Sequence, residues 1–287
     1  MKKYRREFIK AGLSWGVVAA AGSPQVLGSV VAKGENLPSS RVVIARDEKL
    51  CTGSTVSERR LLEILDRSIQ TYFNRDNPLE AWRLVAKPGQ VVGLKVNCLA
   101  GRGISTNPSL IEAIGERLQQ VGVGASDIVI WDRLNRDLER GGFAIREQGK
   151  KPRCFGNDHL GYGQQLETFS AAGSLLCRTL TEVCDVVINL PVLKDHGITG
   201  MTMAMKNLFG AIHNPNKYHL NAGDPYVADV YMLPPIRQKI KLTICDAITA
   251  QYEGGPSFMP HWTWLFNGLI VGADPVALDH TGWQILE

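Results

Sequence analysis

Two lysines and a histidine lie close together in the segment from Val183 to Gly210. Lys194 and His196 are two residues apart, and Lys206 and Asn207 follow in the same segment. In an extended chain, side chains two residues apart point to the same side. Histidine titrates near neutrality and suits proton transfer, and lysine binds anionic groups. The segment therefore predicts a site in which His196, Lys194 and Lys206 are catalytic and Asn207 binds the ligand.

The same segment has the pattern of a buried strand, a polar loop and a helix. The strand covers Val186 to Leu190, and Pro191 stops it because proline cannot donate to a ladder. Apolar residues then recur at helical spacing, so we expect Thr199 to cap a helix that Gly210 ends. Lys206 and Asn207 would interrupt the apolar face of that helix.

Polar residues also stand at the carboxyl ends of other predicted strands. Ligands of open parallel sheets bind outside the carboxyl ends of the strands, so these residues are expected to face one site. A helix cap explains the last of them, Asp274, better than a ligand contact does, because Pro275 follows it. The residues predicted to bind ligand, together with Asn207, are Lys95, Asn97, Asp132 and Asp246.

Two kinds of ligand fit this set of side chains. The first is a small anion, a carboxylate or a phosphate, held by Lys95, Lys194 and Lys206 with help from a helix N-terminus near Thr199. The competing interpretation is that the lysines lie on the surface and cover apolar groups with their stems.

The second kind of ligand is a divalent metal such as zinc, nickel or iron. Imidazole and carboxylate donors suit these metals, and the predicted ligands are His196, His213 and His219. Their spacing matches no established metal motif. His159, His261 and His280 have no cluster of donors around them in the sequence. Further carboxylate donors near the three ligands are Asp195, Asp224 and Asp246.

Strands and helices alternate along the chain, which predicts an α/β fold. We expect a mostly parallel sheet with helices on both faces, a doubly wound arrangement, in a single large domain. Residues 33–90 would supply an N-terminal strand and helices, and residues 91–287 the main α/β unit. Periodicity fades between Arg133 and Gly173, which predicts an insertion. The last helix is expected to be unfinished at Glu287, as in a truncated chain.

Residues 1–32 have the pattern of a twin-arginine signal peptide. Arg5 and Arg6 precede Phe8 and an apolar run, Ala11 to Ala21, that is too short to span a bilayer. This predicts export to the periplasm by the twin-arginine machinery, with no membrane anchor after cleavage at Ala32. The alternative is a basic amphipathic helix or a retained anchor.

The charge of the leader and the spacing of the cysteines exclude two classes of protein. Residues 1–32 carry five basic residues and one acidic residue, a net charge of +4 that equals the net charge of the whole chain. The remainder is formally neutral, which argues against nucleic-acid binding. The six cysteines include no C-x-x-C pair, so an iron–sulfur cluster is not expected.

Common catalytic and nucleotide-binding motifs are absent from the sequence after the predicted signal peptide. Residues 33–287 contain no G-x-S-x-G, no G-x-x-x-x-G-K-[ST] and no G-x-G-x-x-G. An aromatic group between Tyr252 and Phe266 could stack a planar ligand, but the packing of a loop against the core explains it better.

Seven ordered pieces of the sequence resemble the group known as domain of unknown function 362. The resemblance runs from about Val91 to the end of the chain. It implies a shared pocket around Lys95, Asn97, Lys194, His196, Lys206 and Asn207, without naming an occupant. Many relatives carry ferredoxin-like cysteine clusters, which this sequence lacks. The pieces are Lys95-Val96-Asn97, Thr106-Asn107-Pro108, Asp185 to Pro191, Lys194-Asp195-His196, Lys206 to Gly210, Glu253 to Pro256 and Ala273 to Ala277.

The sequence thus leaves three functions open. The first is an exported protein that binds an anionic ligand or cofactor at the carboxyl edge of the sheet, and is an enzyme if His196 transfers a proton. In that case Asp246 or Asp132 would orient His196 or a metal. The second is a non-catalytic periplasmic binding or redox accessory protein. The third is a metal-dependent isomerase or racemase, suggested by the histidines and lysines alone.

Overall fold

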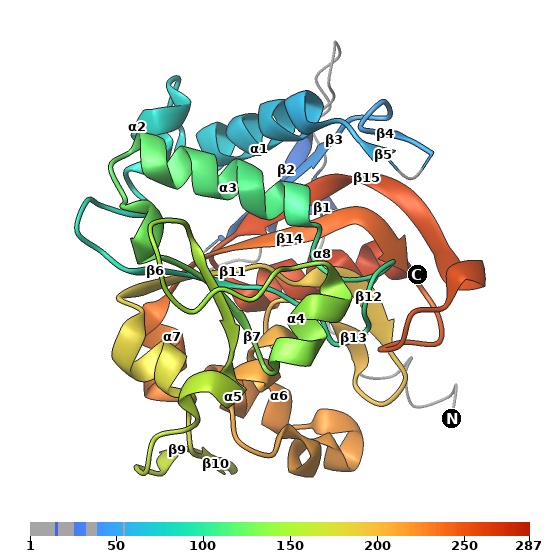
Figure 1. The fold of residues 1–287 in the computed structure, drawn as a ribbon. Helices are drawn as coiled ribbons and strands as arrows, with labels where there is room; N and C mark the ends of the chain where they lie inside the picture. The colour runs from blue at the N-terminus through green and yellow to red at the C-terminus, as the bar shows by residue number, and fades with distance from the viewer. Residues whose placement is uncertain (1–14, 17–25, 33–38, 54) are drawn as a thin grey trace.

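The computed structural model describes residues 15–16, 26–32, 39–53 and 55–287. They form a single α/β domain around a mixed, mostly parallel sheet, as the sequence predicts (Figure 1). The strands of this sheet are β1 (Trp15–Gly16), β2 (Val26–Ala32), β3 (Arg41–Arg46), β6 (Val92–Lys95), β7 (Ile128–Asp132), β8 (Arg153–Gly156), β11 (Val186–Asn189), β12 (Val192–His196), β13 (Gly200–Thr202), β14 (Ile240–Gln251) and β15 (Thr263–Gly272).

The strands follow the order β1-β2-β3-β15-β14-β11-β6-β7-β8 across the sheet. Neighbours are parallel from β14 to β8 and antiparallel from β14 to β1. Strand β12 also pairs in parallel with β14, beyond the end of β11, and carries β13 as an antiparallel neighbour. The chain therefore resumes a strand after Pro191, so the prediction that this proline simply ends the strand is incomplete.

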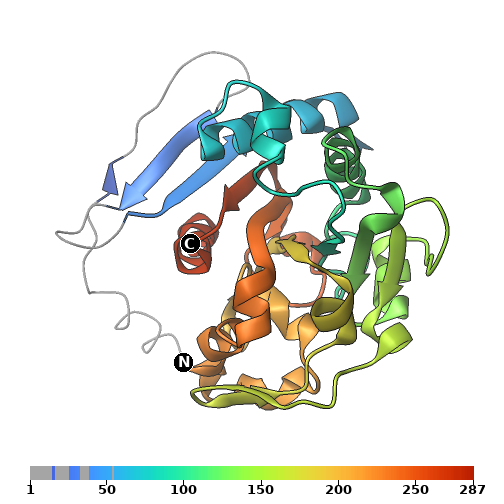
Figure 2. The ribbon, with the colours of Figure 1, turned by 90° about the vertical axis from the view of Figure 1, so that its left-hand side faces the viewer.

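Helices cover both faces of the sheet (Figure 1), as predicted. One face packs under α1, α2 and α3, and the opposite face packs against α6 and α7. Figure 2 shows the red C-terminal helix α8 beside the blue strands β2 and β3. The helices are α1 (Glu58–Phe73), α2 (Pro78–Trp82), α3 (Pro108–Gln120), α4 (Asn135–Gly141), α5 (Asn157–Leu160), α6 (Tyr226–Tyr231), α7 (Pro234–Lys239) and α8 (Pro275–Leu286).

The predicted insertion, residues 133–173, holds α4, β8, α5 and a small hairpin of β9 (Glu167–Phe169) and β10 (Ala172–Ser174). Its strand β8 pairs in parallel with β7 and becomes the edge of the main sheet. Another small hairpin joins β4 (Cys51–Thr52) to β5 (Thr55–Val56). The insertion thus extends the sheet as well as covering its edge.

The prediction of a helix that begins at Thr199 is wrong. The chain instead turns from β12 into β13, and Gly200 in this turn has a φ of +85°, which favours glycine. A short 3₁₀ helix, Lys206–Ala211, follows. The backbone N–H groups of Ala204 and Met205 donate to Asp279 of α8, so a long-range contact fixes the chain just before Lys206.

Two short helices, α6 and α7, lead into strand β14. Pro234 cannot continue α6, and it occupies the first turn of α7 instead. The strand after α7 does not end at Asp246 as predicted, because β14 runs from Ile240 to Gln251. Asp246 therefore lies inside a strand and not at its carboxyl end.

The predicted signal peptide lies mostly outside the described residues. Of residues 1–32, only Trp15–Gly16 and Val26–Ala32 are described, and the latter pairs with β3 as an antiparallel neighbour. Within the described part of the chain, no helix is long and apolar enough to cross a membrane. The signal peptide stays a prediction from the sequence.

Candidate functional site

A pocket of about 400 Å³ lies at the carboxyl ends of the central strands. We call it the lysine pocket. Strand β6 delivers one lysine, β12 delivers a lysine and a histidine, and the 3₁₀ helix delivers a lysine and an asparagine. The predicted site residues that line it are Lys95, Asn97, Asp132, Lys194, His196, Lys206, Asn207 and His219.

Lys95 and Asp132 form an ion pair at the base of the lysine pocket. The Lys95 Nζ lies 2.8 Å from Asp132 Oδ1, and both side chains are almost completely buried. The same amine donates to the Val96 carbonyl, and Asp132 Oδ2 accepts from the Cys98 backbone N–H. The carboxylate therefore neutralises this buried lysine and also ties the ends of two adjacent strands together.

Three asparagine side chains connect the rest of the pocket floor. Asn207 Oδ1 accepts from Lys95 Nζ and from Asn97 Nδ2, at 3.3 and 3.0 Å. Its Nδ2 donates to the Lys95 carbonyl and to Asn189 Oδ1, at 3.2 and 2.8 Å. All of these groups are buried. Because both ends of the Asn207 amide are engaged within the protein, Asn207 organises the pocket floor.

Lys194 donates to neutral oxygens. Its Nζ lies 3.1 Å from Asn97 Oδ1 and 3.5 Å from the Ile104 carbonyl, and the side chain is 1% exposed. Burial lowers the pKa of this amine to about 8, although the more distant charges of Asp132 and Asp195 act in the opposite direction. Lys194 thus keeps its positive charge at pH 7 without a carboxylate in contact.

Lys206 lies against an imidazole and a phenyl ring. Its Nζ is 2.9 Å from His219 Nε2 and 3.7 Å from the centre of the Phe209 ring. The side chain is 7% exposed, and burial lowers its pKa to about 7. An amine with this pKa is about half neutral near pH 7.

His196 is buried with one nitrogen occupied. Its Nδ1 accepts from the backbone N–H groups of Ile198 and Thr199, each at 3.3 Å, so the neutral ring carries its proton on Nε2. Burial, with the charges of Lys206, His219 and Lys194, lowers its pKa to about 3. At neutral pH His196 is therefore a hydrogen-bond donor, and the prediction that it transfers a proton has no support from this geometry.

Several predicted residues lie away from the lysine pocket. Asp246 faces a separate pocket, and its two carboxylate oxygens accept from the backbone N–H groups of Asn107 and Ile248. It therefore cannot orient His196, and that prediction is wrong. The carboxylate of Asp195 points toward the turn that contains Gly255 and accepts its backbone N–H. Neighbours along β12 thus face opposite sides, as strand geometry requires.

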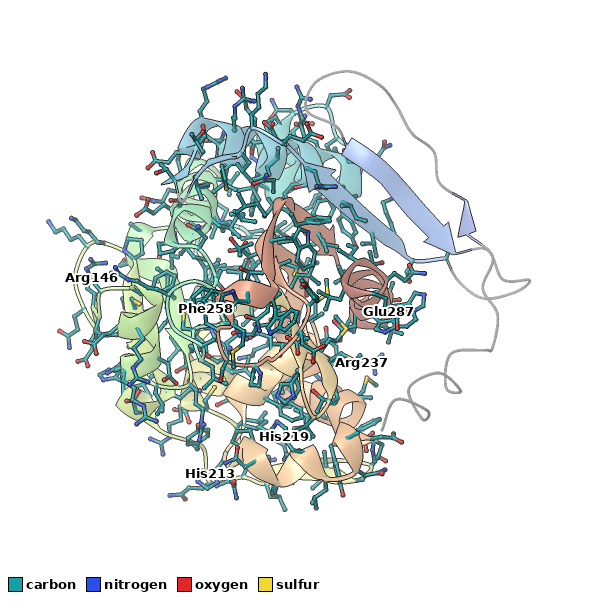
Figure 3. All side chains as sticks on the ribbon, turned by 90° about the vertical axis from the view of Figure 1, so that its right-hand side faces the viewer. Arg146, His213, His219, Arg237, Phe258 and Glu287 are labelled. Carbon is teal, nitrogen blue, oxygen red and sulfur yellow. The ribbon has the colours of Figure 1, made fainter. Side chains whose placement is uncertain are left out.

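The three histidines predicted to bind a metal do not converge. His196 and His219 stack with ring centres 5.3 Å apart, but His213 is exposed and packs edge-on against Tyr162. Figure 3 shows His213 at the margin of the molecule and His219 further in. Among the described residues, no group of three or more His, Cys, Asp and Glu side chains is arranged to hold a metal ion. The structure therefore does not bring His196, His213 and His219 together as the predicted set of metal ligands.

The sequence reasoning missed two charged residues of the pocket. Arg133 and Asp137 line it from the start of the insertion. Asp137 is 4% exposed, and burial together with the nearby charge of Asp132 raises its pKa. The position of Arg133 directly after Asp132 was the only available signal, because residues 133–173 lack periodicity.

The cysteines behave as buried hydrophobic residues. All six are free thiols, and only Cys51 is partly exposed. Burial raises the pKa of Cys154, Cys177 and Cys184 to about 12. None of them lines the lysine pocket.

The fold and the pocket define an α/β protein with buried lysines and amides at the carboxyl edge of its sheet. The chain matches the family described as Domain of unknown function (DUF362) over residues 92–284, and it belongs to that family. This range includes every residue of the pocket named above and confirms the resemblance found in the sequence.

A curated protein and a solved structure are among those similar to this chain. The thylakoid-associated protein sll1697 of Synechocystis sp. is 30% identical over 221 residues, which cover 73% of this chain and 67% of the relative. A crystal structure of a protein from Thermotoga maritima is 11% identical, with a TM-score of 0.46. That comparison covers 82% of this chain and 60% of the Thermotoga protein.

Asp132→Asn is expected to destabilise the protein by roughly 3–5 kcal/mol, because it leaves the buried Lys95 ammonium without its counter-charge. Urea unfolding measures the loss. Glu63→Gln is the matched control, since it breaks the surface pair of Arg59 and Glu63 and should cost at most about 1 kcal/mol. The double variant Lys95→Met/Asp132→Asn should recover part of the loss. Equal losses for Asp132→Asn and Glu63→Gln would contradict the structural role of the ion pair.

Lys206→Met is expected to change how stability depends on pH. The pKa of Lys206 is about 7 when folded and near its ordinary 10.5 when unfolded, so unfolding takes up a proton between these values. The wild-type free energy of unfolding therefore gains a contribution from this amine as pH rises from 7 to 10. The methionine variant lacks that gain, so its advantage over wild type should be largest below pH 7 and shrink toward pH 10.

Urea unfolding of both proteins across this pH range, in buffers free of polyvalent anions, tests the expectation. Lys217→Met is the control, because Lys217 is an exposed lysine close by in the sequence, and its curve should run parallel to that of wild type. A constant difference between Lys206→Met and wild type would show that Lys206 is not deprotonated in the folded protein.

Proposed function

We propose that the protein binds a small anionic ligand, a carboxylate or a phosphate, in the lysine pocket. One observation carries this proposal: Lys194 and Lys206 are buried amines that face a pocket, and no ion pair joins either of them to a carboxylate in the described part of the chain. Burying a cation without a counter-charge costs free energy, which an anionic ligand would offset.

The remaining groups in the pocket support an anion over a cation. His196 presents an N–H donor at neutral pH, because two backbone N–H groups occupy its other nitrogen. The Asp132 carboxylate is already paired with Lys95. Arg133 adds a further cation to the lining. A ligand entering the pocket thus meets mostly amines and N–H donors. Among the described residues that line the pocket, Asp137 is the one carboxylate that is not paired with Lys95.

Wild-type protein is expected to bind malonate or inorganic phosphate more tightly at pH 6.5 than at pH 9. The bound anion favours the charged amines and raises their pKa values, so binding takes up protons. Calorimetric titrations in two buffers of different ionisation enthalpy measure both the affinity and the proton uptake. Lys194→Met should weaken binding roughly 10- to 100-fold, the loss expected for a hydrogen bond to a charged group.

Lys217→Met is again the control and should bind as wild type does. Absence of binding by both anions, or an affinity for them that does not change between pH 6.5 and 9, would contradict the proposed function.

We further propose that the protein is exported by the twin-arginine pathway to the periplasm. The leader residues Arg5, Arg6 and Phe8 support this, as does the name of the Synechocystis relative, which associates that protein with thylakoids. Replacing both arginines by lysine should leave the precursor in the cytoplasmic fraction of a host with this pathway. Fractionation and immunoblotting of the two forms test the expectation, and unchanged export of the lysine variant would contradict it.

A further inference from the structure

Lys206 differs from the other two lysines of the pocket in what its amine contacts. Lys95 meets a carboxylate, and Lys194 meets an amide oxygen and a carbonyl oxygen. Such oxygens hold an amine as ammonium. Among the described residues, the amine of Lys206 has a single hydrogen-bond partner, the imidazole of His219, and it lies against the face of Phe209. Lys206 is therefore the lysine of this pocket whose surroundings least oppose the neutral, nucleophilic form.

His219 is oriented to accept a proton from Lys206. Its Nδ1 lies 3.2 Å from the Pro215 carbonyl and 3.3 Å from the Asn216 carbonyl. Carbonyl oxygens only accept, so Nδ1 carries the ring proton and Nε2 presents a lone pair to the amine. His196 stacks on this ring, with ring centres 5.3 Å apart. The arrangement matches a nucleophile with an adjacent base that a third contact orients.

We propose that Lys206 forms an imine with the carbonyl group of a small 2-oxo carboxylate bound in the lysine pocket. The inference rests on the proposed function, because the carboxylate of such a ligand is the anion that the pocket binds. The ammonium of Lys194 and the Nε2–H of His196 supply donors for the carboxylate. The amine of Lys206 supplies the nucleophile for the carbonyl carbon.

The reaction balances with water as its only by-product. The Lys206 Nζ lone pair attacks the carbonyl carbon, and the C=O π electrons move to oxygen. A proton passes from nitrogen to that oxygen, with His219 Nε2 in position to relay it, and a carbinolamine results. Loss of the hydroxyl group as water, with a second proton from nitrogen balancing the step, forms the C=N bond. The lowered pKa of Lys206 supplies the neutral amine for this attack near pH 7.

Reduction of the imine tests the inference. Full-length purified protein is incubated with glyoxylate at pH 7 and treated with sodium cyanoborohydride, which reduces an imine to a secondary amine. Peptide mass spectrometry should find carboxymethyl-lysine at Lys206, formed roughly a hundredfold faster than at exposed lysines such as Lys217, because a lowered pKa leaves more of the amine neutral. Malonate, which has no electrophilic carbonyl of this kind, should protect Lys206 by occupying the pocket.

Two variants separate the nucleophile from the anion site. Lys206→Arg keeps a cation but cannot form the imine, so it should lose the labelling at this position. Lys194→Met keeps the nucleophile and should slow labelling at a fixed, low glyoxylate concentration by weakening the binding of the carboxylate.

The outcomes also distinguish the two proposals. If malonate binds in the pocket but Lys206 is labelled no faster than Lys217, the imine inference is wrong and anion binding stands. If neither malonate nor glyoxylate binds, both are wrong. If Lys206 is labelled quickly and malonate gives no protection, the amine is merely reactive, and the assignment of a 2-oxo carboxylate site is overturned.

Discussion

The buried ion pair between Lys95 and Asp132 is the interaction on which the site depends. It joins the carboxyl ends of β6 and β7, and the same lysine also contacts Asn207 from a distant part of the chain. A buried cation without a counter-charge would shift the lysine to its neutral form or force the strands apart. With the pair in place, the strands end in a fixed position, and the segment that carries Lys206 packs against them.

The asparagine network extends this order to Lys194 and to the segment that carries Lys206. Asn97 links Lys194 to Asn207, and Asn207 links both to Asn189 of the neighbouring strand. An amide has both a donor and an acceptor end, so it can connect groups of different polarity without adding charge. The network thereby positions the amine of Lys194 directly and the backbone next to Lys206 through Asn207, and it brings no carboxylate into contact with either amine. This arrangement supports the proposed binding of an anion, since a carboxylate in place of the Asn97 amide would already have paired with Lys194.

Sequence reasoning located the pocket because strand order and strand ends follow simple rules. Lys95 and Asp132 stand where hydrophobic strands end, and the edge of a parallel sheet brings such ends together. The same rule failed for Asp246, because the prediction placed the carboxyl end of the strand there. The apolar and β-branched pattern of β14 in fact continues to Gln251. Lys206 was predicted to lie on a helix beginning at Thr199, but the structure has strand β13 and a short 3₁₀ helix there. Its true position depends on Asp279 and Asn189, contacts between residues far apart in sequence that no local pattern reveals.

The two stacked histidines show why residue types alone do not define chemistry. In sequence, His196 suggests proton transfer, and His196 and His219 both suggest metal ligands. In the structure, backbone N–H groups occupy Nδ1 of His196 and backbone carbonyls occupy Nδ1 of His219, so the two rings carry their protons on different nitrogens. One ring becomes a donor toward the pocket and the other an acceptor toward Lys206. The backbone therefore fixes complementary roles for two identical side chains, and it does so without either ring becoming charged.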